Sequence, residues 1–344
     1  MTMIFSTFVS LFALTSLAVA HPGEVHRRLS DAELARRSAS AAARHLAARN
    51  CAPEIAAFNA KRKAKRALAK RQEPTTTVSA EGPHYTEIQN NTCVLTPEAV
   101  EGPYYINNEM VRGNLIEDQA GVPLTLDIGV VDINTCEPLS DVFVELWACN
   151  ATGVYGGYPA QLGAPPGPPP NSSLEARQAP GGGTTPLQRN ETFLRGGLPT
   201  DSNGIVEITT LYPGFYEGRT IHIHTMFHIG YEIAPNGTLI SHAGNLAHIG
   251  QLYFDDAFSD QVLALEPYTS NTNNRTLNED DGILQDQLED DNNAFVAVEL
   301  LGETLADGVL GYITVGVDST ASYGISNTNY LNSTGTEGED LVTV

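Results

Sequence analysis

The chain has 344 residues and is strongly acidic, with 41 Asp and Glu against 19 Lys and Arg and a net charge of −22 at pH 7. Residues 1–71 hold 13 of the basic side chains and four of the acids, so the remainder carries six arginines, no lysine and 37 acids. A body this acidic repels nucleic acids and anionic membranes, which argues against both as partners.

The first 20 residues have the pattern of a secretory signal peptide. Their apolar run closes with Ala18-Val19-Ala20, a small-x-small cleavage site that leaves His21 as the new N-terminus. A membrane anchor is the weaker interpretation, because the run is short and no later stretch is apolar enough to span a bilayer. We therefore expect a secreted protein. Seven N-x-Ser/Thr sequons fit a glycoprotein with solvent-facing loops: Asn90, Asn150, Asn171, Asn190, Asn236, Asn274 and Asn332.

Residues 21–71 form a basic leader that is rich in Ala and Arg and is expected to be helical. It contains dibasic pairs of the kind that secretory-pathway proteases cut: Lys61-Arg62, Lys65-Arg66 and Lys70-Arg71. Either the leader is a propeptide removed near Arg71, or it is a helix that stays attached. The four cysteines do not decide between these interpretations, and their pairing stays open: Cys51, Cys93, Cys136 and Cys149. If the leader is removed, Cys51 leaves with it, unless Cys51 tethers the leader.

The body runs from residue 93 to 318 and is long enough for one domain with its own core. A polar linker, residues 72–92, precedes it, and an acidic Ser/Thr/Gly/Asn-rich tail, residues 319–344, is expected to be disordered. A Pro/Gly-rich loop, Pro159–Gln188, is either a functional lid or a surface insertion. Short strand-like segments predict an all-β protein with an antiparallel β-sandwich: LTLDIGVVDI, VFVELWAC, GIVEITTLYPG, TIHIHTMFHI, IGQLYF and GYITVGVD.

Two histidines in the segment LYPGFYEGRTIHIHTMF predict a metal site. His222 and His224 are two residues apart on a predicted strand, so their rings leave the same face. The zinc motifs H-E-x-x-H and C-x-x-C are absent, and the first acid after the pair is Glu232, too far along for a cupin or a local carboxylate ligand. A zinc hydrolase is therefore a poor interpretation.

Phenols are the remaining ligands that the neighbourhood offers. The candidates are Tyr155, Tyr158, Tyr212 and Tyr216. A phenol has an ordinary pKa near 10 and coordinates as phenolate, so it requires a strongly Lewis-acidic ion. Ferric iron fits, because two phenolates and a hydroxide neutralise its charge and two neutral imidazoles complete five-coordination.

These residues carry a resemblance to a known family. The segment PGFYEGRTIHIH resembles the P-G-x-Y…R-x-x-H-x-H signature of the intradiol ring-cleavage dioxygenases, and VELWACNATGVYGG resembles their V-x-x-W-x-x-N-x-x-G-x-Y signature. CVLTPEAVEGPYYI is similar to their segment ending G-P-[FY]-Y, and NETFLRGGLPTDSNGIVEITTLYPG matches the version of the secreted fungal branch. The motifs lie in the family's order over residues 93–227, and the family fold is a β-sandwich.

The resemblance implies which residues hold the metal. The ferric ligands that it implies are Tyr155, Tyr216, His222 and His224. Tyr155 is preferred to Tyr158 because the family tyrosine follows the glycine of N-x-x-G by two residues. Tyr216 is preferred to Tyr212 because the family tyrosine follows Pro-Gly by two residues, and it is implied to leave the metal with a proton when substrate binds.

The resemblance also implies which residues meet the substrate. Arg219 matches the arginine that holds and polarises the bound catechol. Pro103, Tyr104 and Tyr105 correspond to the segment that lines the substrate cleft, and Gln251 matches a glutamine near the site. Trp147 is expected to pack in the core.

The implied protein is a secreted non-heme Fe(III) dioxygenase of the catechol 1,2 type. It adds both atoms of O2 to a small aromatic diol and cleaves the ring between the hydroxylated carbons, giving a muconate-type diacid, without an organic cofactor. The family favours a homodimer. The alternative is a secreted, transthyretin-like β-sandwich binding module without turnover. The sequence does not identify the natural catechol.

Overall fold

The structure is a computed structural model that describes residue 47 and residues 50–72, 101–158, 187–288 and 293–331. The expected signal peptide, most of the linker, Cys93 and nearly all of the Pro/Gly-rich loop lie outside the described residues. None of the helices in the described part of the chain has the length and hydropathy needed to cross a bilayer.

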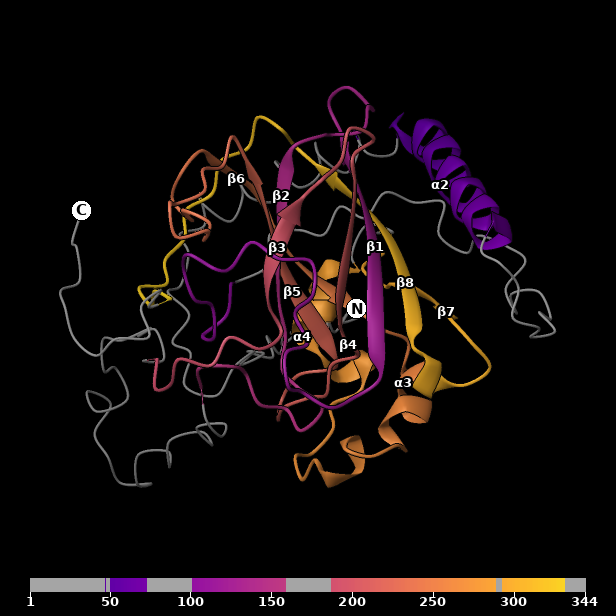
Figure 1. Cartoon of the computed structure of the whole chain (residues 1–344), viewed down its shortest axis with the longest axis vertical. Coiled ribbons are helices and arrows are strands. Elements are labelled where there is room, and N and C mark those ends of the chain that lie inside the picture. The colour runs from indigo at the N-terminus through magenta and orange to yellow at the C-terminus, as the bar shows by residue number, and fades with distance from the viewer. Residues whose placement is uncertain (1–46, 48–49, 73–100, 159–186, 289–292, 332–344) are drawn as a thin grey trace, which may run out of the picture.

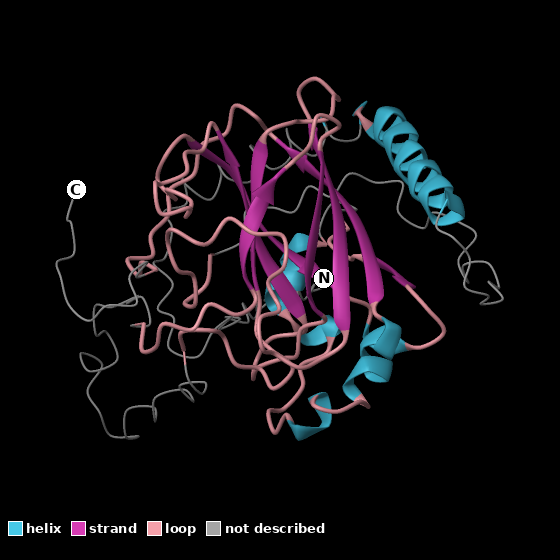
Figure 2. Ribbon diagram, in the orientation of Figure 1, coloured by secondary structure: helices cyan, strands magenta, loops and turns pink. Residues whose placement is uncertain are grey.

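Two four-stranded sheets form the body (Figures 1 and 2). In spatial order the first sheet contains β4 (Ile205–Leu211), β1 (Pro123–Asp132), β8 (Val309–Val317) and β7 (Ala297–Leu300). The second contains β3 (Arg195–Pro199), β2 (Val142–Trp147), β5 (His222–Ile229) and β6 (Asn245–Tyr253). In the first sheet β1 pairs parallel with β8 and antiparallel with β4, and β7 pairs antiparallel with β8; the second sheet is antiparallel throughout. The predicted β-sandwich is confirmed, with one parallel pair.

In the described part of the chain, one long helix and two short ones accompany the sheets. They are α2 (Ala52–Gln72), α3 (Asp256–Leu263) and α4 (Gly282–Gln287), with 3-10 turns η1 (Tyr268–Ser270), η2 (Asn278–Asp280) and η4 (Leu305–Asp307). Asp255 and Asp281 cap α3 and α4, because each side chain accepts hydrogen bonds from backbone N–H groups of the first turn. The helix expected in the basic leader is present as α2, and Cys51 just before it forms a disulfide with Cys136.

Side chains alternate across the strands, and this alternation decides where the core and the site lie. Leu126 and Ile128 of β1 and Val144 and Leu146 of β2 point between the sheets, where they are buried in the main core. Ile223 of β5 belongs to the same core. The flanking side chains of β5 therefore lie on the outer face of the second sheet, under the loops that cover it.

The ordered chain extends beyond the expected end of the body. Residues 319–331 are described, and they pair with the second sheet and its neighbours: the Tyr323 N–H donates to the Leu246 carbonyl at 2.8 Å, and the Leu331 N–H donates to Asn107 at 2.9 Å. Tyr323, Ile325 and Leu331 pack against a buried aromatic cluster. The composition predicted disorder from residue 319 onward, because the few apolar residues that make these contacts are outnumbered by Ser, Thr, Gly and Asn.

Candidate metal centre

Two loops that carry tyrosines meet backbone to backbone. Gly153 has φ +85°, and a Cβ there would lie 2.2 Å from the carbonyl oxygen of Phe215. A Cβ on Gly214 would lie 2.4 Å from the carbonyl oxygen of Ala151. Only glycine permits this approach at both positions. The approach brings Tyr155 and Tyr216, each two residues after one of these glycines, to ring centroids 5.7 Å apart.

Asn150 shapes the first of these loops. Its side-chain oxygen accepts hydrogen bonds from the N–H groups of Thr152 at 3.1 Å and Val154 at 3.0 Å, and its amide nitrogen donates to Gln119 at 2.9 Å. The loop therefore depends on the Asn side chain for its turn.

The two histidines of β5 present nitrogens to each other. The Nε2 atoms of His222 and His224 are 3.1 Å apart, and the hydroxyl of Tyr216 lies 3.5 Å from His222 Nε2. Nδ1 of His222 is 2.6 Å from the Thr220 carbonyl oxygen, to which it donates its proton, so Nε2 carries a lone pair. Burial and the charge of Arg219 lower the pKa of His222 well below its ordinary value, which keeps the ring neutral. A neutral imidazole whose other nitrogen donates to a backbone carbonyl has the arrangement of a metal-ligating histidine.

The four candidate tyrosines differ in the hydrogen-bond partners of their hydroxyl groups. Tyr155 is 2% exposed, and its hydroxyl has no hydrogen-bond partner among the described residues. Tyr158, in contrast, donates to the Tyr105 carbonyl at 3.1 Å and accepts from Asn329 at 2.6 Å. Tyr212 is bonded to Ser259 at 2.7 Å. A buried hydroxyl without a hydrogen-bond partner requires an explanation, and the role of a metal ligand explains it for Tyr155.

The phenol chemistry restricts which ion fits. Burial raises the pKa values of Tyr155 and Tyr216 well above 10, so neither ionises here without a strong cation beside it. Within the described residues, no three His, Cys, Asp or Glu side chains gather to hold a metal. Among the described residues, Tyr155 and Tyr216 are phenols whose rings lie beside those of His222 and His224, and phenolate donors suit a highly charged, Lewis-acidic ion.

Arg219 is buried against the site rather than on the surface. It is 1% exposed, and its Nε donates to Asp281 at 2.8 Å. One terminal nitrogen donates to Gln251 Oε1 at 2.6 Å and to the Tyr253 hydroxyl at 3.2 Å. An exposed salt bridge, the alternative role for this arginine, is thereby excluded. Gln251, predicted to lie near the site, is the residue opposite His224 on β6.

The predicted cleft segment splits in two. Tyr104 joins the site: its ring stacks on Tyr155 at 4.7 Å and meets Tyr216 edge-on at 5.9 Å. Tyr105 points the other way, with its ring on Trp147 and its hydroxyl directed to Glu145 and Ser241 at 3.1 Å. Pro103 is only partly buried. The structure therefore does not bring the Tyr105 hydroxyl to the metal centre.

Trp147 is buried in a core cluster, as expected, and it also lies beside the site. Its ring stacks on His224 with centroids 4.8 Å apart and planes 7° apart, because the two face each other across β2 and β5. Two further residues beside the site were missed. Arg195 is buried with its guanidinium over the rings of Tyr155 and Tyr158 at 5.8 and 5.5 Å. Its presence in a lysine-free body was the only available signal. Asp281, the partner of Arg219, is 62 residues away and offered none.

Comparison with known proteins agrees with this geometry. No protein-family model matches the sequence, and no curated protein matches it. Among solved structures, an intradiol ring-cleavage dioxygenase from Tetranychus urticae is 28% identical with a TM-score of 0.51, covering 67% of this chain and 98% of that one. A second crystal structure, of a dioxygenase, is 28% identical with a TM-score of 0.52 and the same coverage.

The fold and the site define a class of β-sandwich protein with a buried Tyr/His centre. Within that class the chain resembles the intradiol ring-cleavage dioxygenases, and the recognition made from its motifs is confirmed. Membership of the secreted fungal branch stays a prediction of those motifs.

Proposed function

We propose that the chain is a ferric intradiol dioxygenase that acts on a small aromatic 1,2-diol of the catechol type. One observation carries the proposal: the Nε2 atoms of His222 and His224 lie 3.1 Å apart, and the Tyr216 hydroxyl lies 3.5 Å from His222 Nε2. Beside them is the buried hydroxyl of Tyr155, which has no hydrogen-bond partner among the described residues. The reaction consumes one catechol and one O2, breaks the carbon–carbon bond between the hydroxylated carbons, and leaves one oxygen atom on each new carboxyl group of a muconate-type diacid.

The four residues that hold the iron are Tyr155, Tyr216, His222 and His224. Ferric iron, when bound, supplies the Lewis acidity that polarises the diol towards dioxygen. The Tyr155 ring is fixed between Tyr104 and Arg195, so this phenolate is the permanent anionic ligand. Trp147 holds His224 in plane, and the Thr220 carbonyl fixes the tautomer of His222.

Tyr216 is the residue that accepts a proton from the substrate. It lies on a loop rather than a strand. Burial raises the pKa of Tyr216, and the positive charge of Arg219, the largest of the charge effects on this group, lowers it. Arg219 in turn compensates negative charge that develops on the diol. Its guanidinium is preorganised by Asp281 and Gln251, so no reorganisation accompanies the reaction.

The transthyretin-like binding module is not favoured. The two solved structures described above are dioxygenases. A binding module also has no use for a buried phenol such as Tyr155, whose hydroxyl has no hydrogen-bond partner among the described residues. We also propose that the protein is secreted, on the strength of the N-terminal apolar run and its Ala18-Val19-Ala20 end. Secretion predicts recovery from the culture medium with His21 or a later residue at the N-terminus.

Metal analysis combined with product analysis tests the function. We expect purified protein to contain one iron per chain, to show a visible phenolate-to-iron band, and to convert catechol to a diacid that carries both atoms of labelled O2. Protein that lacks iron after expression with added iron, and that does not consume O2 with any simple catechol, would contradict the proposal. Zinc in place of iron would do the same.

A further inference from the structure

Helix α2 is joined to the β-sandwich by a covalent bond. Cys51, the residue before the helix, forms a disulfide with Cys136 in the turn that follows β1. Cys51 and Ile55 are buried together with Val131 and Ile133 in a small apolar cluster. The basic leader is thereby tied to a point on the body 85 residues further along the chain.

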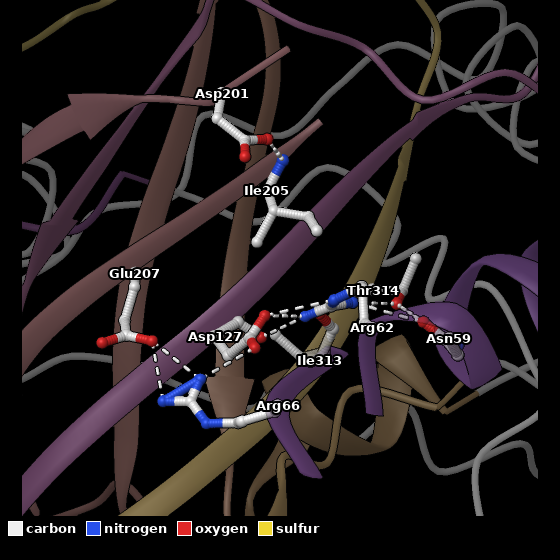
Figure 3. Close-up of polar contacts among 9 residues, drawn as sticks. All are labelled: Asn59, Arg62, Arg66, Asp127, Asp201, Ile205, Glu207, Ile313 and Thr314. Atoms are coloured by element: carbon white, nitrogen blue, oxygen red, sulfur yellow. Dashed lines mark hydrogen bonds and ion pairs between the residues drawn. The ribbon is translucent and has the colours of Figure 1, made fainter. Parts of the chain in front are cut away.

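A buried ion pair fixes the middle of the helix (Figure 3). The guanidinium of Arg62 contacts the Asp127 carboxylate of β1 and donates to the Asp127 carbonyl at 2.6 Å. It also donates to the hydroxyl of Thr314 on β8 at 2.9 Å. Arg62 is 5% exposed and Asp127 is 6% exposed, so both charges depend on this contact.

The body is shaped to receive these side chains. A Cβ on Gly129 of β1 would lie 2.4 Å from Arg62 Nη1 and 2.5 Å from Phe58 Cε1. The position is a glycine in a strand that is otherwise rich in β-branched and aliphatic residues, and the glycine leaves room for the helix. Arg66 adds a contact with Glu207 at 2.7 Å (Figure 3).

The three dibasic pairs therefore differ in what a protease can reach. The arginine of the first pair, Arg62, lies inside the interface, and that of the second, Arg66, is held by Asp127 and Glu207. The third pair, Lys70-Arg71, occupies the last turn of α2, which ends at Gln72. Helix ends fray, and a frayed end supplies the extended backbone that endoproteases require.

We propose that a dibasic-specific endoprotease hydrolyses the peptide bond between Arg71 and Gln72, and that the residues before the cut stay on the body as a second chain. One water is consumed, and the new carboxyl group belongs to Arg71. The disulfide between Cys51 and Cys136 keeps the two chains together. The leader is thus both cleaved and retained, and its arginines continue to neutralise a strongly acidic sheet.

Limited proteolysis of the purified full chain tests this. We expect a dibasic-specific endoprotease to cut the folded protein after Arg71, giving one band on a non-reducing gel and two bands after reduction. The peptide that ends at Arg62 is expected only when the protein is denatured before digestion. A Lys70→Gln, Arg71→Gln double variant is the matched control and is expected to stay one chain under both gel conditions.

Three results would overturn the proposal. The first is release of the N-terminal fragment on a non-reducing gel, which shows that Cys51 and Cys136 are not joined. The second is cleavage of the folded protein after Arg62 as fast as after Arg71, and the third is no cleavage after Arg71. A Cys136→Ser variant checks the bond itself, because its cut fragment is expected to separate on a denaturing gel without reductant.

Discussion

The environment of each tyrosine hydroxyl predicts what its removal does. The Tyr155 hydroxyl is buried and has no hydrogen-bond partner in the part of the chain that the structure describes, whereas the Tyr158 hydroxyl donates to Tyr105 and accepts from Asn329. We expect Tyr155→Phe to hold little iron and Tyr158→Phe to hold a full complement. In the metal-free proteins the order reverses: Tyr158→Phe loses about 1–2 kcal/mol of unfolding free energy, while Tyr155→Phe loses almost none.

Iron content per chain and urea unfolding of the metal-free variants measure both effects. Tyr158→Phe protein that lacks iron, together with Tyr155→Phe protein that keeps it, would reverse the ligand assignment. The stability measurement remains informative even if both variants lose iron, because it reports directly on the hydrogen bonds.

Arg219 has a structural effect and a chemical effect that can be separated. Arg219→Gln leaves Asp281 buried without its cation, so we expect a loss of about 3–5 kcal/mol in stability. Turnover should fall by roughly a hundredfold or more, because a preorganised donor is lost, while the iron and its colour remain. Adding Asp281→Asn removes the stranded charge, so it is expected to restore much of the stability and none of the turnover.

Single-turnover ring cleavage on iron-matched samples and thermal unfolding check this pair of effects. Turnover that recovers with stability in the double variant would show that Arg219 acts only by supporting the fold. Lysine at this position is expected to rescue turnover in part, since an ammonium lacks the planar fork of the guanidinium.

The resemblance to the family motifs implied the parts of the site that lie within one motif, Tyr155 over Tyr158 and Tyr216 over Tyr212. In the structure the hydroxyls of Tyr158 and Tyr212 have hydrogen-bond partners, and that of Tyr155 has none among the described residues. The direction of Tyr105 could not be predicted, because adjacent residues in a loop carry no fixed alternation. Asp281 could not be found either, since the pairing with Arg219 depends on how a distant helix packs against the second sheet.

At the scale of elements, the segment 319–331 forms a strap over the aromatic cluster of the site. Asn329 holds the strap in place through two hydrogen bonds. Its amide nitrogen donates to the Tyr158 hydroxyl at 2.6 Å, and its side-chain oxygen accepts from the Leu187 N–H at 3.2 Å. Composition predicted disorder here, because Ser, Thr, Gly and Asn outnumber the apolar residues that fix the strap. The ordered strap is therefore known from the structure and could not be predicted from the sequence.

Loosening the strap is expected to alter substrate binding more than chemistry. Asn329→Ala removes two hydrogen bonds at the wall beside Tyr158, so we expect a loss of about 1–2 kcal/mol in stability. The KM for catechols should rise severalfold, with kcat within about threefold of the parent, because the metal ligands are untouched. Thr328→Ala is the control, since that side chain is exposed. A fall in kcat at unchanged KM would contradict this role.

For the whole molecule, His222 sets an expected dependence of stability on pH. Burial and the charge of Arg219 lower its pKa in the folded protein well below 6.5. Below about pH 6.5 the unfolded chain binds a proton at this ring and the folded chain does not, so acid favours unfolding. This ring alone is expected to cost the metal-free protein about 1.4 kcal/mol of stability per pH unit there, until its folded pKa is reached.

Urea unfolding of the metal-free protein between pH 4 and 7 measures this slope. His222→Gln should remove the contribution of this ring from the slope. An equal slope in the parent and in His222→Gln would show that this histidine is charged in the folded state.

The parallel pairing of β1 with β8 has a consequence for biosynthesis. Leu124 lies opposite Val309, so the first sheet lacks β8 until residues 309–317 have left the ribosome. The second sheet is built from residues 142–253 and is complete much earlier in translation. The growing polypeptide thus presents a finished histidine-bearing sheet while its other layer is still open. Translation that stops before residue 309 is expected to leave an aggregation-prone half-molecule, and chaperones are expected to bind the nascent chain during this interval.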